Sequence, residues 1–250
     1  MMKITNEYLD ISNEFININK KIFSSRLGNL IGINKWEKKG DTLLKMWKLV
    51  ADEPINPFYL ERGEIAEKIV KQQFENLGIK HTYYGLSASG KKIFDLFETS
   101  NPVFGGVYDF VLTDNKVAVE VKSKNIKDFQ TIQQKGADPT HLAEVELVSY
   151  LGSLEKFCIW YVFFTDEQEQ KIKDGNFTDE DIKAFNFLQQ SIRFSGKVNE
   201  QRIQSAMLKA YDYREQVLKD RKIPLSDISE KMLQKIMLKE NDIFGRKEIK

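Results

Sequence analysis

Residues 105–123 read GGVYDFVLTDNKVAVEVKS, and this stretch decides the fold. Both of its ends are rich in β-branched and aromatic residues, and Asp114-Asn115 separates them, which predicts two strands joined by a turn. Glu120 and Lys122 are two residues apart, so a strand points them to the same face. Asp109 lies in the other predicted strand and can face them across the hairpin.

Two carboxylates beside an ammonium group suit a particular chemistry. They can hold a hard divalent cation and polarise a phosphate or a water molecule. Glu120 and Lys122 alternate with valines in a run that otherwise indicates a buried strand, where charges are costly unless they are paired or metal-bound. A hairpin with solvated charges on its outer face is the open alternative, because Glu and Lys are common on strand surfaces.

Composition bounds the class of protein. The 250 residues suffice for one α/β domain, or for a domain with a helical appendage. The formal net charge is only +1, so the whole-chain balance gives no support to nucleic-acid binding, and any basic surface must be local. One cysteine, Cys158, and two histidines effectively exclude zinc sites and iron–sulfur clusters.

No segment indicates a membrane or secretory destination. The longest apolar run, residues 157–164, is far too short to span a bilayer. The first residues lack the apolar core of a signal peptide. We therefore expect a cytoplasmic protein with no membrane partner.

The rest of the chain predicts a mixed α/β core over residues 1–165, followed by a helical extension over 166–250. The extension either packs on the core or forms a small subdomain. Strands are expected at 79–85, 91–98 and 156–164, besides the hairpin. Helices are expected at 1–22, 24–32, 41–52, 57–77, 140–151, 178–190, 199–219 and 226–238.

The predicted helix at 57–77 carries further carboxylates. Glu61, Glu64 and Glu67 are spaced three residues apart, which places them on adjacent parts of one helical face. They form either a solvated acidic stripe or a source of one more ligand for a metal at the hairpin. Lys124, Lys127 and Lys135, which follow the hairpin, similarly indicate either a segment that tracks a phosphate backbone or a solvated loop.

Asp109 with Glu120-Val121-Lys122 resembles the motif of the PD-(D/E)XK nucleases, although Tyr108 replaces the Pro that often precedes the acid. The segment 62–67, RGEIAE, is similar to a helical motif of the lambda-exonuclease-like and YqaJ-like viral recombinases of that superfamily. The resemblance implies that Glu67 is the helical metal ligand, with Glu64 as the less favoured candidate.

Two further segments resemble the same family. Ser25 and Gly32 have the family's seven-residue spacing, and Asn34 and Trp47 follow them. The resemblance implies that Ser25, with Arg26 as the nearest arginine, holds the 5′-phosphate of a DNA end.

After the hairpin, family members have a helix, a glycine and a hydrophobic strand. The predicted helix at 140–151, Gly152 and the predicted strand at 156–164 match this order. There Glu144 and Glu146 replace the family's Gln-x-Gln. Either a Glu serves as an accessory metal or water ligand, or the glutamine role is lost.

The resemblance implies an α/β fold with a PD-(D/E)XK restriction-endonuclease-like core, in which helices flank a mixed central sheet. It also implies a Mg²⁺-dependent exonuclease, with Mn²⁺ as the alternative cofactor, that hydrolyses linear double-stranded DNA from the 5′ end. Asp109, Glu120, the Val121 carbonyl and Glu67 would bind the metal, and Lys122 would position the attacking water or stabilise charge on the phosphate.

The expected partners, by the same resemblance, are duplex DNA, a single-strand annealing protein and further copies of the chain in a homo-oligomeric ring. Two alternatives remain open from the sequence. One is a sequence- or structure-specific endonuclease on the same core. The other is a non-catalytic DNA-binding or inhibitory protein derived from the nuclease fold.

Overall fold

A mixed five-stranded sheet forms the centre of the computed structural model, which describes residues 2–85 and 92–245, with side chains up to residue 238. The strand order is β4-β6-β7-β8-β9, and only the central pair β7-β8 is parallel. The strands are β4 (His81–Tyr83), β6 (Phe110–Leu112), β7 (Val117–Asn125), β8 (Lys156–Phe164) and β9 (Ser191–Lys197). This arrangement confirms the predicted mixed α/β core.

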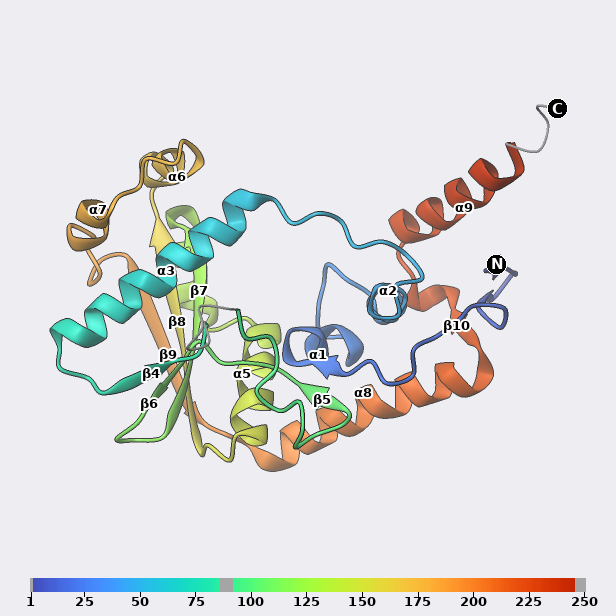
Figure 1. Cartoon of the computed structure of the whole chain (residues 1–250), viewed down its shortest axis with the longest axis horizontal. Helices are drawn as coiled ribbons and strands as arrows, with labels where there is room; N and C mark the ends of the chain where they lie inside the picture. Colours follow the sequence, from blue (N-terminus) through green and yellow to red (C-terminus); the bar gives the residue numbers. More distant parts are fainter. Residues whose placement is uncertain (1, 86–91, 246–250) are drawn as a thin grey trace.

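Helices cover both faces of this sheet (Figure 1). On one face, α3 (Pro57–Asn76) contacts β7, α6 (Asp166–Lys173) and α7 (Asp179–Lys183). On the other face, α5 (Pro139–Leu151) packs against β7 and β8. Behind α5 lie α1 (Ser24–Leu30) and α8 (Glu200–Asp220), so this side of the molecule is two helical layers thick.

Strand β8 explains why both faces must be covered. Every residue after Lys156 in this strand is buried, so alternate side chains supply two separate cores. The core on the α3 side contains Cys158, Trp160, Val162 and Phe164. The core on the α5 side contains Phe157, Ile159, Tyr161 and Phe163.

The helices that frame the sheet have the expected ends, with one exception. Helix α3 begins as predicted, because the Asn56 side chain accepts a hydrogen bond from the Phe58 amide at 3.0 Å and Pro57 follows it. Helix α5 also forms as predicted, but its cap is Asp138, which accepts from the Thr140 amide at 2.8 Å. The helix therefore begins at Pro139, one residue before the expected start at residue 140.

The N-terminal segment is not the helix that its sequence predicts. It forms β1 (Lys3–Ile4), β2 (Tyr8–Asp10) and β3 (Ile22–Phe23). Short polar side chains bind the local backbone between the strands: Asp10 accepts from the Ser12 amide at 2.8 Å and Asn17 accepts from the Asn19 amide at 3.0 Å. Such bonds stabilise turns at the expense of a helix.

These N-terminal strands join distant parts of the chain. Strand β2 lies between β1 and β10 (Lys222–Pro224), and β3 pairs in parallel with β5 (Phe104–Gly105). The chain around residue 100 is thereby held next to the start of α1.

The strand expected at 91–98 is also absent from its described part, residues 92–98, where Lys92 makes only an isolated bridge. Asp95 instead organises a loop. Its carboxylate accepts from the amides of Phe97 at 2.9 Å and Gly106 at 3.2 Å, and from Lys21 at 2.8 Å. Helix α2 (Lys39–Met46) is shorter than expected, since Lys48 adopts a left-handed φ of 58° just after it.

The C-terminal part is less helical than predicted. Strand β9 completes the central sheet, and α7 covers five residues of the helix expected at 178–190. The remaining elements are η1 (Ile126–Asp128), α4 (Phe129–Lys135), η2 (Leu225–Asp227) and α9 (Glu230–Gly245). The expected division of domains at residue 165 stays a prediction, although β9 shows that residues after it share the sheet.

None of the helices in residues 2–85 and 92–245 has the length and apolar content that a bilayer span requires.

Gly106 lies where the chain that leads into the hairpin passes close to two helices. A Cβ atom at this residue would lie 2.6 Å from Ser24 Oγ and 2.7 Å from Val148 Cγ1. Since Ser24 begins α1 and Val148 lies in α5, the absence of a side chain lets the backbone pass between these two helices.

We expect Gly106→Ala to lower the free energy of unfolding by about 1–3 kcal/mol, because the added methyl group overpacks this contact. Gly63→Ala is the matched control. A Cβ at Gly63 meets no atom within 4 Å, and this helical position gains about 0.5–1 kcal/mol from alanine. Urea denaturation measures both, and equal stability of the two variants would contradict the predicted strain at Gly106.

Candidate active site at the divergence of two strands

The predicted acids of the hairpin meet where β6 and β7 diverge. The pairing of these strands ends at Phe110 and Val119, so Asp109, which precedes Phe110, is the first residue outside the ladder. Beyond this pair, the Asp109 side chain accepts the hydrogen bond in place of a backbone carbonyl: its Oδ2 receives a bond from the Val121 amide at 2.7 Å. The carboxylate is thus fixed against β7, next to Glu120.

Lys122 lies at the centre of the site. Its Nζ donates to Glu120 Oε1 at 2.7 Å and to Glu144 Oε2 at 2.7 Å. Glu120 and Lys122 therefore share a face of β7 as their spacing predicts, and Glu144 approaches from α5. Burial pulls the pKa of Lys122 down, but the two carboxylates outweigh burial and raise the pKa well above its usual value.

Glu120 is the buried carboxylate of the site, and Asp109, Glu67 and Glu144 are half-buried. Glu120 is 6% exposed, and its Oε2 has no hydrogen-bond partner among the described residues. Burial raises the pKa of Glu120, and the charges of Asp109 and Glu144 raise it further against the opposing effect of Lys122. Burial and the charge of Glu67 raise the pKa of Asp109 to about 7.

Glu67 approaches the same site from α3. Its Oε2 accepts a hydrogen bond from the Tyr83 hydroxyl at 2.7 Å. Burial is the main cause that raises the pKa of Glu67, and the charge of Glu120 adds to it. Helix α3 and the hairpin thus bring Glu67 into the electrostatic neighbourhood of Asp109 and Glu120, as the sequence predicts.

The donor set fits a hard divalent cation in its chemistry. Carboxylate oxygens are the ligands that Mg²⁺ and Mn²⁺ prefer, and Glu120 Oε2 has no hydrogen-bond partner among the described residues. Within residues 2–85 and 92–245, however, no three Asp, Glu, His or Cys side chains are arranged so that they could hold a metal ion together.

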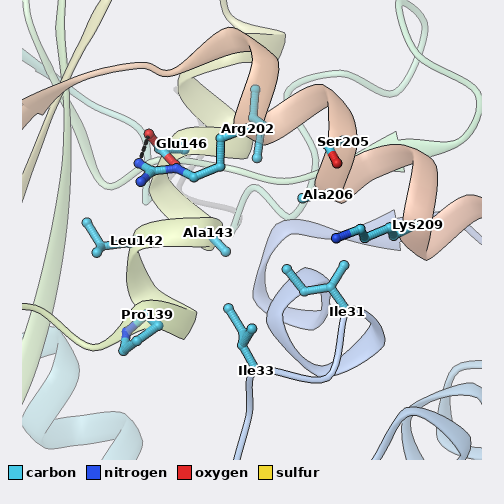
Figure 2. Close-up of a pocket in the computed structure, with 11 residues that line it drawn as sticks. Ile31, Ile33, Pro139, Leu142, Ala143, Glu146, Arg202, Ser205, Ala206 and Lys209 are labelled. Atoms are coloured by element: carbon cyan, nitrogen blue, oxygen red, sulfur yellow. Dashed lines mark hydrogen bonds and ion pairs between the residues drawn. The ribbon is translucent and has the colours of Figure 1, made fainter.

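Two of the accessory candidates lie outside the cluster. Glu64 is exposed and lies 4.0 Å from the ammonium group of the exposed Lys92, and no hydrogen bond or ion pair among the described residues joins it to Asp109 or Glu120. Glu146 is buried and turns towards α8, where Arg202 donates to its Oε2 at 3.0 Å and to its Oε1 at 2.5 Å (Figure 2). Of the two glutamates that replace the family's glutamines, only Glu144 contacts the site.

The residues predicted to bind a 5′-phosphate lie on α1. Ser25 is exposed in the first turn of this helix, whereas its neighbour Ser24 is buried against Gly106. Arg26 extends towards α2, with Nη1 3.5 Å from the Thr42 carbonyl oxygen. No hydrogen bond or ion pair in the described part joins either residue to the carboxylate cluster, and their phosphate-binding role stays a prediction.

The sequence interpretation missed two residues beside the cluster. His141 Nδ1 lies 2.8 Å from the Tyr161 hydroxyl, which also accepts from the Asp138 amide at 3.1 Å. Burial, with help from the charge of Lys122, lowers the pKa of His141 to about 4, so this imidazole is neutral at pH 7. The three-residue spacing of His141 and Glu144 on one helix was the available signal.

Comparisons with known proteins agree with this geometry. No family model matches the sequence, and no curated protein matches it. Among solved structures, an alkaline exonuclease (LHK-Exo) from Laribacter hongkongensis is 13% identical, with a TM-score of 0.55 over 81% of this chain and 90% of that one. Its complex with dAMP is 12% identical with a TM-score of 0.57, over the same shares of the two chains.

A phage-related exonuclease from Haemophilus somnus 129PT is similar to the same extent. It is 16% identical, with a TM-score of 0.55 over 83% of this chain and 98% of that one. At such low identity the match concerns the fold, and it extends over nearly the whole length of each exonuclease. The chain therefore has the mixed α/β fold of the alkaline and phage-related exonucleases.

Proposed function

We propose that the protein is a divalent-metal-dependent deoxyribonuclease that degrades linear duplex DNA from its 5′ end. One observation carries the proposal: Lys122 is held between the buried carboxylate of Glu120 and the half-buried carboxylate of Glu144, next to Asp109, at the point where two central strands diverge. Burial of charged groups costs free energy of folding, and the fold shared with exonucleases supports a catalytic role for these charges.

The proposed metal ligands are Asp109, Glu120 and the carbonyl of Val121, with Glu67 added from α3. The free Oε2 of Glu120 and the mutual repulsion of the carboxylates support this assignment. Bound Mg²⁺ or Mn²⁺ would make a coordinated water more acidic and neutralise charge on the phosphate.

Lys122 is the proposed catalytic cation. Its raised pKa keeps the ammonium group protonated at neutral pH, so it acts as a hydrogen-bond donor and not as a base. From its position on β7 it would orient the attacking water or stabilise negative charge that develops on the phosphate oxygens. Glu144 is a positioning residue in this scheme, since it fixes the second direction in which Lys122 donates.

The 5′ polarity rests on the resemblance of Ser25 and Arg26 to the phosphate-binding residues of the lambda-exonuclease-like family. A hydroxyl and a guanidinium are suitable ligands for a terminal phosphate. That the Laribacter exonuclease binds the deoxynucleotide dAMP supports DNA as the substrate class.

One prediction of this proposal concerns cleavage. The protein should degrade linear 5′-phosphorylated duplex DNA with Mg²⁺ and not with EDTA, and it should leave closed circular DNA intact. Asp109→Asn and Lys122→Gln should each reduce the rate by a factor on the order of 10³ or more, because each removes charge at the reacting phosphate. Gel electrophoresis of the products measures this.

Glu64→Gln is the matched control, since this carboxylate is exposed and pairs only with Lys92. It should retain near-normal activity. Cutting of the circle would identify an endonuclease on the same core, and metal-independent binding without cleavage of either substrate would identify a non-catalytic DNA-binding protein.

Another prediction concerns the charge of Asp109 and needs no substrate. In EDTA at pH 8, Asp109→Asn should raise the free energy of unfolding by about 1–2 kcal/mol, because it removes a buried charge and keeps an oxygen that accepts from the Val121 amide. The pKa of Asp109 is raised to about 7 from 3.8, so the folded protein retains a proton that the unfolded chain releases. Stability is therefore lost as pH rises through 7, and the benefit of Asn should vanish near pH 4.

Addition of Mg²⁺ or Mn²⁺ at pH 8 should raise the unfolding temperature of the wild-type protein and leave that of the Asp109→Asn, Glu120→Gln double variant unchanged. Differential scanning calorimetry measures both effects. If the double variant gained as much from the metal as the wild type, the metal would bind elsewhere and the assignment would be wrong.

A further inference from the structure

A buried ion pair joins α3 to α6, the two helices on one side of the strand that carries Lys122 (Figure 1). Arg62 Nη1 donates to Glu169 Oε1, and each of the two residues is only 9% exposed. Burial of two opposite charges costs about as much free energy as their attraction returns, so apolar side chains of the same size would stabilise the fold at least as well. Stability alone therefore does not explain this pair.

The other donors of Arg62 bind the strand itself. Arg62 Nε donates to Ser123 Oγ at 3.3 Å, and Nη2 donates to the Ser123 carbonyl oxygen at 3.2 Å. Ser123 directly follows Lys122 in β7, and the alternation of side chains along a strand turns it to the opposite face, towards α3. One guanidinium group thus joins α3, β7 and α6 next to the proposed catalytic lysine.

The geometry of the guanidinium group restricts this junction. Its donors form a rigid planar fork, and each of its three nitrogens donates to a different acceptor atom. The rings of Phe58 and Tyr59, in the first turn of α3, lie 5.3 and 5.2 Å from Arg62 Cζ, within the range of cation–π contacts. A lysine in place of Arg62 would keep the positive charge but lose the planar fork.

The apolar face of α3 does not by itself fix the position of this helix along the sheet. Its buried apolar side chains pack into the core that the sheet forms on this side, and hydrophobic contacts are not directional. Hydrogen bonds to Ser123 are directional, so Arg62 fixes α3 relative to β7. Glu67 lies five residues after Arg62, about 7.5 Å further along the helix axis. Its position relative to Glu120 therefore follows from this anchor.

We propose that Arg62 and Glu169 are positioning residues, which set the place of Glu67 beside Glu120 and thereby the affinity of the candidate site for a divalent cation. Neither residue touches the metal or the DNA in this scheme. Glu169 acts by holding Arg62, and Arg62 acts by holding α3 on β7. The inference rests on the proposed nuclease function, because that function supplies the metal.

Metal affinity measured without DNA tests this inference. Isothermal titration calorimetry with Mn²⁺ should give a dissociation constant about 10- to 100-fold higher for Arg62→Lys than for the wild type, the range that loss of a group orienting a metal ligand produces. Glu169→Gln should shift the constant in the same direction by a smaller factor, because the neutral amide keeps the shape and an accepting oxygen but holds the guanidinium less tightly. If Arg62→Lys does not fold, Glu169→Gln decides the test.

Asp166→Asn is the matched control. Asp166 also joins α6 to the end of β7, since it accepts from Lys127 at 2.7 Å and from Asn125 at 3.0 Å. These contacts are exposed and involve no residue of α3. The control variant should therefore bind Mn²⁺ as the wild type does.

A double variant tests whether Glu169 acts through Arg62. Arg62→Lys combined with Glu169→Gln should bind Mn²⁺ no more weakly than Arg62→Lys alone, because residues that act as a unit give non-additive losses. Additive losses would contradict this order of action.

Cleavage kinetics should separate the same variants by their metal dependence. The Mg²⁺ concentration that gives half the maximal rate should rise for Arg62→Lys, and excess Mg²⁺ should restore most of kcat. The KM for DNA should stay unchanged, because the side chains of Arg62 and Glu169 are buried and do not meet the substrate. A raised KM that excess Mg²⁺ does not lower would contradict the positioning role.

The outcomes separate this inference from the proposed function. Lower unfolding temperatures of Arg62→Lys and Glu169→Gln with wild-type affinity for Mn²⁺ would show that the pair only stabilises the fold, which overturns the inference and leaves the nuclease intact. Weaker Mn²⁺ binding by both variants, with no cleavage by the wild type, would uphold the positioning of a metal site and overturn the nuclease. A wild-type protein that neither binds Mn²⁺ nor cleaves DNA would overturn both.

Discussion

The paired hydrogen bonds of Lys122 to Glu120 and Glu144 are the constraint on which this side of the structure depends. They join β7 to α5 through charges that would each be costly to bury alone. For Glu144 to reach the lysine, α5 must lie close over the sheet. Two close approaches place it there, because a Cβ at Gly28 would touch Thr140 at 3.1 Å and one at Gly106 would touch Val148 at 2.7 Å.

The charge balance of the cluster gives it a purpose beyond packing. Asp109, Glu120, Glu144 and Glu67 face a single ammonium group, so the fully ionised site carries an excess of negative charge. Burial and the charge of Glu67 raise the pKa of Asp109 to about 7, so protonation offsets part of this excess. A divalent cation would relieve it without protons, and the unpartnered Glu120 Oε2 is then a binding group kept at the expense of stability.

The sequence predicted the elements whose side chains are buried in a regular pattern. The β6–β7 hairpin, β8 and α3 have strong periodicity and defined ends, and their carboxylates meet as expected. Strand β9 was missed and its residues were read as part of a helical tail, because only Ile192 and Phe194 supply its apolar alternation and its side chains are at most partly buried. The N-terminal strands were missed for another reason: each is two or three residues long, and β2 and β3 pair with strands about 80 to 215 residues away in the chain.

The two glutamates that replace the family's Gln-x-Gln show why such substitutions need a structure to interpret. Residues two apart on a helix point about 200° away from each other, so Glu144 and Glu146 meet different surroundings. Glu144 gains a lysine and becomes part of the site, whereas Glu146 is neutralised by Arg202 of α8. A buried glutamate at this position would be unstable without that arginine. Arg202 thus joins α8 to α5, and this contact ties the C-terminal part of the chain to the fold that carries the candidate site.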